Sequence, residues 1–287
     1  LPDSGMRAKV WSYERSLPGE NLPIQEYYIF DVDKKSNIKI DLEPFEDIWS
    51  EFAPAWTEDS KIFYFAKMTR YYKTINLYFA DPESGKTRNI IHEKAKTMIE
   101  YQMVGCKLVN NGEKAVWMSE RDGWSHLYLY DGKTGNLINQ ITKGEFVVRE
   151  INYIDDKNEI IYFTACGVEK DRDPYFKHLY KINFDGTEMT LLTPEDAEHE
   201  IEFAPDYSYF IDNFSRVDLK PKAVLRRLSD GMLIKELQEA NIDKLIATGW
   251  KHPERFIVKA RDGKTDLYGV LQYPSNFDPN KKYPIID

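Results

Sequence analysis

Short apolar runs alternate along the chain with tight polar turns, a pattern that predicts antiparallel strands rather than helices. The runs are rich in Tyr, Phe, Ile and Val, and Asp-Gly, Asn-Gly and Ser-Gly pairs separate them, as is usual between hairpin strands. The clearest predicted strands cover residues 62–66, 76–80, 87–91, 114–119, 125–130 and 137–142.

The pattern repeats about every fifty residues. The tripeptide at 76–78 is followed by Asp81 and Gly85, and the related tripeptide at 126–128 is followed by Asp131 and Gly135. Similar segments start at residues 28 and 178, and a weaker copy lies at residues 223–225. Since further short runs lie ahead of these sets, at residues 52–56, 147–153 and 201–203, one repeat contains four strands.

Four strands in about fifty residues have the size of a β-propeller blade. A β-sandwich also contains many short strands, but it does not need a sequence that repeats at a fixed period. We therefore predict an all-β fold, a partial β-propeller of about four to five four-stranded blades.

The pattern changes near the end of the chain. Residues 241–247 have the spacing of a short helix that Asn241 caps and Gly249 follows. Residues 256–260 and 266–273 then predict a hairpin that leads into a polar, proline-containing stretch. We expect the propeller segment to cover residues 1–248 and a second domain to begin within residues 249–287.

The two faces of a propeller carry different loops. When the strands of a blade are named A to D from the hub outward, the A–B and C–D turns share one face and the B–C loops share the other, here called the B–C face. The predicted B–C loops at residues 67–74, 167–177 and 213–222 are long, charged and aromatic, whereas the turns of the other face are compact. Because binding groups concentrate on loops held by a rigid scaffold, the B–C face is the predicted binding face.

Composition narrows the function classes. The net charge of -9 argues against a nucleic-acid surface, and no apolar run approaches the length of a membrane helix. Cys106 and Cys166 are too few for a disulfide framework and are expected to be buried thiols. The chain opens without Met or a leader pattern, which we interpret as an excised piece.

Motifs for catalysis are missing from the sequence. It contains no G-x-S-x-G elbow, no H-E-x-x-H, no P-loop and no G-x-G-x-x-G. Of the five histidines, His126 and His178 hold equivalent places in the repeat, which favours a packing role. The acidic cluster at residues 195–202 includes His199 and could supply metal ligands, but a charged connector between blades is the preferred interpretation. We expect no metal and no cofactor.

Two segments carry a family likeness. Residues 119–131, with the sequence Ser-Glu-Arg-Asp-Gly-Trp-Ser-His-Leu-Tyr-Leu-Tyr-Asp, and residues 260–286, from Ala-Arg-Asp-Gly-Lys to Lys-Tyr-Pro-Ile-Ile, resemble the dipeptidyl peptidase IV branch of the prolyl oligopeptidase family of serine peptidases. Residues 191–197, 203–206 and 209–218 add weaker matches. Residues 1–48 resemble the family only loosely.

The resemblance implies an eight-bladed propeller that covers an α/β-hydrolase domain and admits short peptides, in a periplasmic or secreted protein. It places the Ser, His and Asp of the catalytic triad beyond residue 287, so residues 249–287 would hold only the first strands of the hydrolase domain. The family's acidic pair for the substrate amine has no counterpart, since the chain lacks a Glu-Glu dipeptide. Dipeptidyl specificity therefore stays open against a broader oligopeptidase or acylaminoacyl type.

Two functions follow. The first is a substrate-gating and domain-docking propeller of a serine exopeptidase or oligopeptidase for short, proline-containing peptides, with its own hydrolase domain as partner and pairing into a homodimer through exposed blade edges. The second is a non-catalytic propeller that binds a partner protein or glycan. The hydrolase-like tail favours the first. Residues on the B–C face that would contact substrate or the hydrolase domain are Arg70, Tyr71, Tyr72, Arg121, Trp124, Arg172, Tyr175 and Arg216, although the Asp122-Gly123 pair also suits a tight B–C turn.

Overall fold

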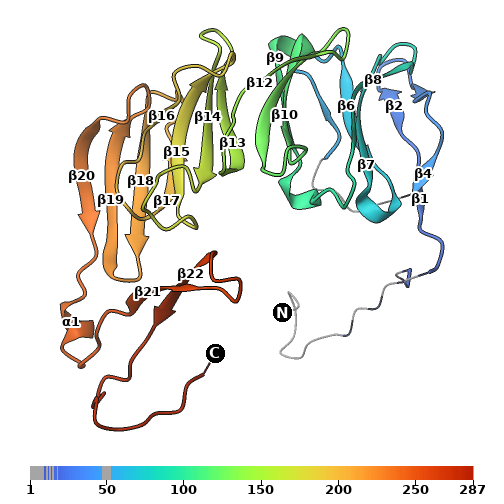
Figure 1. Cartoon of the computed structure of the whole chain (residues 1–287). Helices are drawn as coiled ribbons and strands as arrows, with labels where there is room; N and C mark the ends of the chain where they lie inside the picture. The colour runs from blue at the N-terminus through green and yellow to red at the C-terminus, as the bar shows by residue number, and fades with distance from the viewer. Residues whose placement is uncertain are drawn as a thin grey trace. The chain divides into compact units, whose positions relative to one another are not determined.

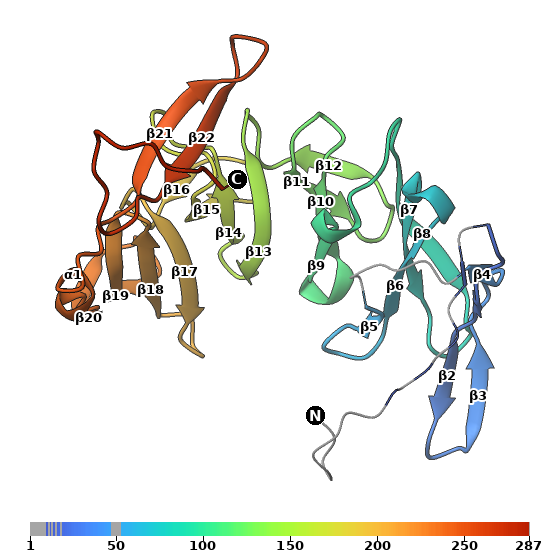
Figure 2. The ribbon, with the colours of Figure 1, turned by 90° about the horizontal axis from the view of Figure 1, so that it is seen from below.

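The computed structural model describes residues 19–46 and 53–286, together with positions 10, 12, 14, 16 and 17. The chain divides after Gln102 into two compact units. Within the described residues both units consist almost entirely of antiparallel strands (Figures 1 and 2). Short helical segments are η1 (Arg70–Tyr72), η2 (Tyr101–Met103), η3 (Asn110–Gly112) and α1 (Asp243–Ile246).

The first unit contains one complete four-stranded sheet and two smaller pairs of strands. The four-stranded sheet has the order β5-β6-β7-β8, and β2 pairs with β3 and β1 with β4. The strands are β1 (Ile24–Gln25), β2 (Tyr28–Asp31), β3 (Ser36–Lys39), β4 (Phe45–Glu46), β5 (Ala55–Trp56), β6 (Phe63–Met68), β7 (Thr74–Ala80) and β8 (Thr87–Lys94).

The second unit contains three four-stranded sheets that follow one another along the chain, and a final hairpin. Each sheet is a simple meander, in which neighbours in sequence are neighbours in space. The strands are β9 (Gly105–Val109), β10 (Lys114–Ser119), β11 (His126–Asp131), β12 (Leu137–Gln140), β13 (Val147–Asp155), β14 (Ile160–Cys166), β15 (Lys177–Asn183), β16 (Thr190–Leu191), β17 (Glu198–Phe203), β18 (Tyr209–Arg216), β19 (Leu219–Arg227), β20 (Leu233–Glu239), β21 (Glu254–Lys259) and β22 (Asp266–Leu271).

These sheets confirm the predicted partial propeller with four complete blades, β5–β8, β9–β12, β13–β16 and β17–β20. The predicted strand at 114–119 coincides with β10, and the other clear strands differ from the observed ones by a few residues. Phe52, the start of one predicted strand, lies outside the described residues. One prediction was wrong: residues 213–222 are not a long loop, because β18 and β19 extend through them and leave only Val217 and Asp218 as a turn.

Apolar side chains fill the spaces between successive sheets of the second unit. Val116, Leu127 and Leu129 of the β9–β12 sheet pack against Val148 and Phe163 of the β13–β16 sheet, all of them buried. The next space holds Leu179 and Leu192 against Phe210 and Leu228. Because a strand places alternate side chains on opposite faces, each middle strand contributes to the cores on both sides.

The repeated aspartate and glycine form the C–D turns. Asp131 Oδ1 accepts hydrogen bonds from the backbone N–H groups of Lys133 and Thr134, at 2.9 and 2.7 Å. Gly135 then takes a φ of 75°, in the left-handed region that favours glycine. Asp81 and Gly85 make the same turn in the preceding repeat. The hydrogen bonds from Ser84 and Thr134 hold the pKa of each aspartate below its usual value.

The glycine of the C–D turn also allows one blade to approach the next. A Cβ atom on Gly231 would lie 2.5 Å from the carbonyl oxygen of Leu192, at the outer strand of the preceding sheet. A Cβ on Gly186 would lie 2.7 Å from the carbonyl oxygen of Ile141, and one on Gly85 would lie 2.5 Å from that of Lys39. Adjacent sheets therefore meet backbone to backbone at this turn.

We predict that Gly231→Ala lowers the free energy of unfolding by about 2 to 5 kcal/mol, because the new Cβ adds a backbone clash to the cost of a left-handed residue. The matched control is Gly263→Ala. Its φ of 68° is close to the 70° of Gly231, but nothing lies within 4 Å of the new Cβ. The control should cost only about 1 to 2 kcal/mol. Equal losses in urea unfolding would contradict the role of close blade approach.

Candidate functional site

The eight predicted contact residues all lie on or beside connections between the second and third strands of a blade. In the second unit this puts Arg121 and Trp124, Arg172 and Tyr175, and Arg216 on the same face. The connections are β6–β7 for Arg70, Tyr71 and Tyr72, β10–β11 for Arg121 and Trp124, β14–β15 for Arg172 and Tyr175, and the end of β18 for Arg216.

Three of the predicted cations, Arg70, Arg121 and Arg216, already have partners within the chain. Arg70 donates to Glu46 Oε1 at 3.1 Å and to the carbonyl oxygen of Glu20 at 3.0 Å. Arg121 donates to Tyr130 Oη at 2.7 Å, and its guanidinium lies 4.3 Å from the centre of the Tyr128 ring. These contacts hold both side chains against their own unit.

Arg216 lies between two carboxylates. Its Nη1 is 2.6 Å from Asp196 Oδ2, and its Nε is 2.5 Å from Asp218 Oδ1. Partial burial opposes the ionisation of Asp218, but the hydrogen bond from Arg216 and the charges of Arg216 and Arg255 outweigh it and keep the pKa of Asp218 below its usual value. Arg216 therefore ties the β18–β19 turn to the connector before β17.

The remaining residues of the set differ in their surroundings. Tyr71 is three-quarters exposed and has a φ of 70°, while the Tyr72 ring packs on Tyr101 at 5.5 Å between centroids. Arg172 is half-buried, and its Nη1 has no hydrogen-bond partner within the described chain. Gly123 takes a φ of 100°, which agrees with the expected tight B–C turn.

The structure brings Trp124 and Tyr175 together at one groove. This groove, here the Trp124–Tyr175 groove, has a volume of about 770 Å³. The ends of β13, β14 and β15 form its floor, and Phe146 and Pro174 add apolar surface to the two exposed aromatic rings. The full lining consists of Trp124, Glu145, Phe146, Val147, Arg149, Glu150, Thr164, Cys166, Gly167, Pro174, Tyr175, Lys177 and Glu198.

A β-bulge places two charges in the groove. The pairing of β13 with β14 shifts between Val148 and Glu150, so that Arg149 is the extra residue. A bulge interrupts the alternation of faces and redirects a side chain. As a result both Arg149 and Glu150 are exposed and line the groove.

The groove carries charges of both signs. Lys177 Nζ pairs with Glu198 at 3.5 Å, whereas Glu145, Arg149 and Glu150 form no ion pair with any described residue. Thr164 is almost completely buried at the floor, and its hydroxyl has no hydrogen-bond partner in the described part of the chain. A buried polar group without a partner is unusual and is a feature of sites that a ligand or water completes.

The groove lining includes one cysteine thiol. Its Cys166 thiol donates to the carbonyl oxygen of Tyr175 at 3.7 Å, and burial raises the pKa of that thiol to about 11. Because the thiolate is the nucleophilic form of cysteine, Cys166 is a poor nucleophile near neutral pH. Aromatic walls beside separated charges of both signs suit short peptides, which carry an amine, a carboxylate and apolar side chains.

Sequence reasoning missed most of the groove. Arg149, Glu150, Thr164, Lys177 and Glu198 were not among the predicted contact residues, although they complete the lining around Trp124 and Tyr175. Two successive charged residues inside the apolar run at 147–154 were an available signal for the bulge. Thr164 and Lys177 give no comparable signal.

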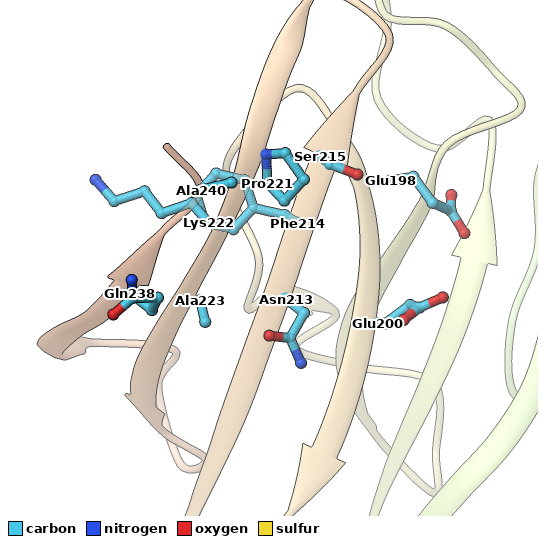
Figure 3. Close-up of a pocket in the computed structure, with 10 residues that line it drawn as sticks. All are labelled: Glu198, Glu200, Asn213, Phe214, Ser215, Pro221, Lys222, Ala223, Gln238 and Ala240. Atoms are coloured by element: carbon cyan, nitrogen blue, oxygen red, sulfur yellow. The ribbon is translucent and has the colours of Figure 1, made fainter. Parts of the chain in front are cut away.

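A second, smaller hollow of about 330 Å³ lies on the β17–β20 sheet (Figure 3). Asn213, Ser215 and Ala223 line it, on the opposite face of the sheet from the buried Phe210 and Asp212. None of its lining side chains is a buried polar group without a partner. The Trp124–Tyr175 groove is therefore the better candidate.

A buried charge network occupies the acidic cluster of the sequence. His199, Asp212 and Arg226 are almost completely buried, with His199 Nδ1 2.7 Å from Asp212 Oδ1 and Arg226 Nε 2.8 Å from Asp212 Oδ2. Arg226 Nη2 also lies 2.5 Å from Glu195 Oε1. Although Glu195, His199 and Asp212 are close enough together to hold a metal ion, the Arg226 guanidinium already contacts two of them, and its positive charge opposes a second cation.

The three buried histidines make contacts inside the fold. His199 Nε2 faces the carbonyl oxygen of Glu195 at 3.0 Å, so both of its ring nitrogens face acceptors. His126 and His178 are buried at the start of equivalent strands, beside Thr142 and Thr193. Burial, and then the neighbouring His199, lower the pKa of His178. These contacts agree with the expected packing role.

We predict that Arg226→Gln lowers the free energy of unfolding by about 3 to 5 kcal/mol, because it leaves two carboxylates without their buried cation. Arg227→Gln is the matched control in the adjacent position. Arg227 is partly exposed, and its one ion pair within the described residues is with Asp230, so the control should cost less than about 1 kcal/mol. Urea denaturation of both variants provides the measurement, and similar midpoints would refute a stabilising role for the network.

Repeated four-stranded sheets with a groove on the B–C face define a β-propeller segment. Comparison with known proteins places it more narrowly. The family described as the dipeptidyl peptidase IV (DPP IV) N-terminal region matches residues 3–221. The chain therefore belongs to this family.

Two related sequences are dipeptidyl peptidases 4 by name. A dipeptidyl peptidase 4 of Arthroderma otae is 30% identical over 190 residues, which are 62% of this chain and 23% of the relative. A probable dipeptidyl peptidase 4 of Emericella nidulans is 26% identical over 274 residues, 88% of this chain and 33% of the relative. The chain thus spans about a quarter to a third of these relatives.

Solved structures support the fold. A putative dipeptidyl aminopeptidase IV from Bacteroides ovatus aligns with a TM-score of 0.74 and 24% identity, over 90% of this chain and 38% of that one. Dipeptidyl peptidase 4 of Porphyromonas gingivalis gives a TM-score of 0.73 at 20% identity, over 90% and 36%. In the described part of this chain, no helix has the length and apolar character needed to span a membrane.

Proposed function

We propose that this chain is the substrate-gating and docking propeller of a serine peptidase that hydrolyses short, proline-containing peptides. The observation that carries the proposal is the Trp124–Tyr175 groove on the B–C face of a chain that belongs to the DPP IV N-terminal family. The relatives' printed names support peptidase activity.

The proposal divides the chain into a propeller segment, residues 1–248, and the opening of a hydrolase domain, residues 249–287. The hairpin β21–β22 supports this division, because it follows α1 and stands apart from the meander of four-stranded sheets. In this arrangement Trp124 and Tyr175 contact the peptide, and the domain that follows supplies the nucleophile.

The test is cleavage of Gly-Pro and Ala-Pro chromogenic conjugates by the full-length protein. We expect Trp124→Ala and Tyr175→Ala to raise KM roughly tenfold, since each removes an aromatic contact. Tyr209→Ala is the control, because Tyr209 is about as exposed as Trp124 but begins β18, at the end of the strand away from the B–C face. A folded full-length protein that cleaves none of the conjugates would favour a propeller that binds a partner protein or glycan.

We also propose that the protein pairs into a homodimer through β20. This strand forms the edge of its sheet, and Leu233, Ile234 and Leu237 are exposed along it. An exposed apolar edge strand is a template for pairing with another chain. Sedimentation of the full-length protein should show a dimer that Ile234→Lys converts to a monomer, whereas Lys235→Glu, a charge change on the same strand, should leave it paired. A monomeric wild type would contradict this proposal.

A further inference from the structure

The β21–β22 hairpin is anchored on the β14–β15 loop through one arginine. Arg255 Nη2 lies 3.6 Å from Asp173 Oδ2, and Arg255 Nη1 lies 3.7 Å from Asp196 Oδ2. The guanidinium also lies 5.2 Å from the centre of the Phe176 ring. A planar guanidinium with several donors suits contact with two carboxylates and an aromatic ring better than a lysine ammonium does.

The same loop forms a wall of the Trp124–Tyr175 groove. Tyr175 lines the groove, and its ring also meets Tyr268 of the hairpin edge to face, with 6.1 Å between centroids and an interplanar angle of 88°. Asp173 links Tyr175 to the hairpin. Its Oδ1 accepts a hydrogen bond from the backbone N–H of Tyr175 at 3.0 Å, and its Oδ2 faces Arg255. The position of Tyr175 is thus tied to the hairpin.

The local balance of charge depends on Arg255. Asp173, Asp196 and Asp218 meet two guanidinium groups, those of Arg216 and Arg255, and Asp196 is shared between them. Without Arg255, three carboxylates would have a single cation, and Asp173 would lose its ionic partner. Repulsion would then favour movement of the β14–β15 loop away from the connector that carries Asp196.

We propose that Arg255 is a positioning residue that holds the β14–β15 loop, and with it Tyr175, in the conformation that completes the groove. Docking of the hairpin and binding in the groove are therefore coupled through Asp173. The identity of the groove's ligand as a short peptide rests on the function proposed above, but the anchoring of the loop does not.

The test is hydrogen exchange of the full-length protein, measured by mass spectrometry. Arg255→Gln should speed exchange of residues 167–177 and of the hairpin roughly tenfold, because local opening becomes less costly. Arg261→Gln is the matched control: it removes the same charge from the same hairpin, at a residue for which the described structure contains no ion pair. Equal exchange of residues 167–177 in the wild type, Arg255→Gln and Arg261→Gln would overturn the proposal.

A second variant distinguishes loss of the anchoring contact from a general loss of stability. Asp173→Asn should produce the same local change, and the double variant should exchange no faster than either single variant if the two side chains act together. Arg255→Lys should restore protection only in part. Additive effects of the two single changes would count against the proposal.

Calorimetry of Gly-Pro binding tests whether the groove keeps its binding conformation. Arg255→Gln should weaken this binding by roughly fivefold to tenfold, and Arg261→Gln should not. Faster loop exchange with unchanged Gly-Pro affinity would overturn the coupling. If the wild type itself does not bind Gly-Pro, the proposed function fails, while the exchange measurement still decides whether Arg255 anchors the loop.

Discussion

The close approach of backbone to backbone at the C–D turns is the constraint on which the remaining structure depends. Gly85, Gly186 and Gly231 each sit with a positive φ against a carbonyl at or just beyond the outer strand of the preceding repeat. The backbone bond from Asp41 N–H to the carbonyl oxygen of Gly85, at 2.8 Å, shows that this contact can continue the hydrogen bonding between repeats. Side chains are excluded there, so the spacing of neighbouring sheets is fixed.

This constraint explains why the two faces of the propeller carry different kinds of loop. Turns that must fit against a neighbouring backbone cannot lengthen, which explains their repeated aspartate and glycine. The B–C loops have no such contact to preserve, and they differ from blade to blade: Val217 and Asp218 suffice between β18 and β19, whereas ten residues separate Cys166 from Lys177. Variation in length and chemistry, and with it the groove, is therefore confined to one face.

Much of the fold was predictable, because its signals are local. A glycine with positive φ, and an aspartate that accepts hydrogen bonds within the same turn, recur in the sequence of the repeats. In the same way, β10 was predicted to the residue. The error at residues 213–222 has a physical cause. Polar and charged residues there, including Lys220 and Lys222, suggest a loop, but both lysines are half-buried residues of β19, and the two strands also bury Phe214 and Val224.

The site was less predictable, because it depends on contacts distant in sequence. An arginine on a loop looks the same in the sequence whether it is free or paired, and Arg70, Arg121 and Arg216 are all paired with groups of their own unit. Freeing such a cation for a ligand would expose its partner carboxylate or break its packing, a cost that the ligand would have to offset. Charges without an ion pair need no such exchange, and in the groove these are Glu145, Arg149 and Glu150. For the proposed function, the number of charged residues on the B–C face therefore matters less than which of them the fold leaves without an ion pair.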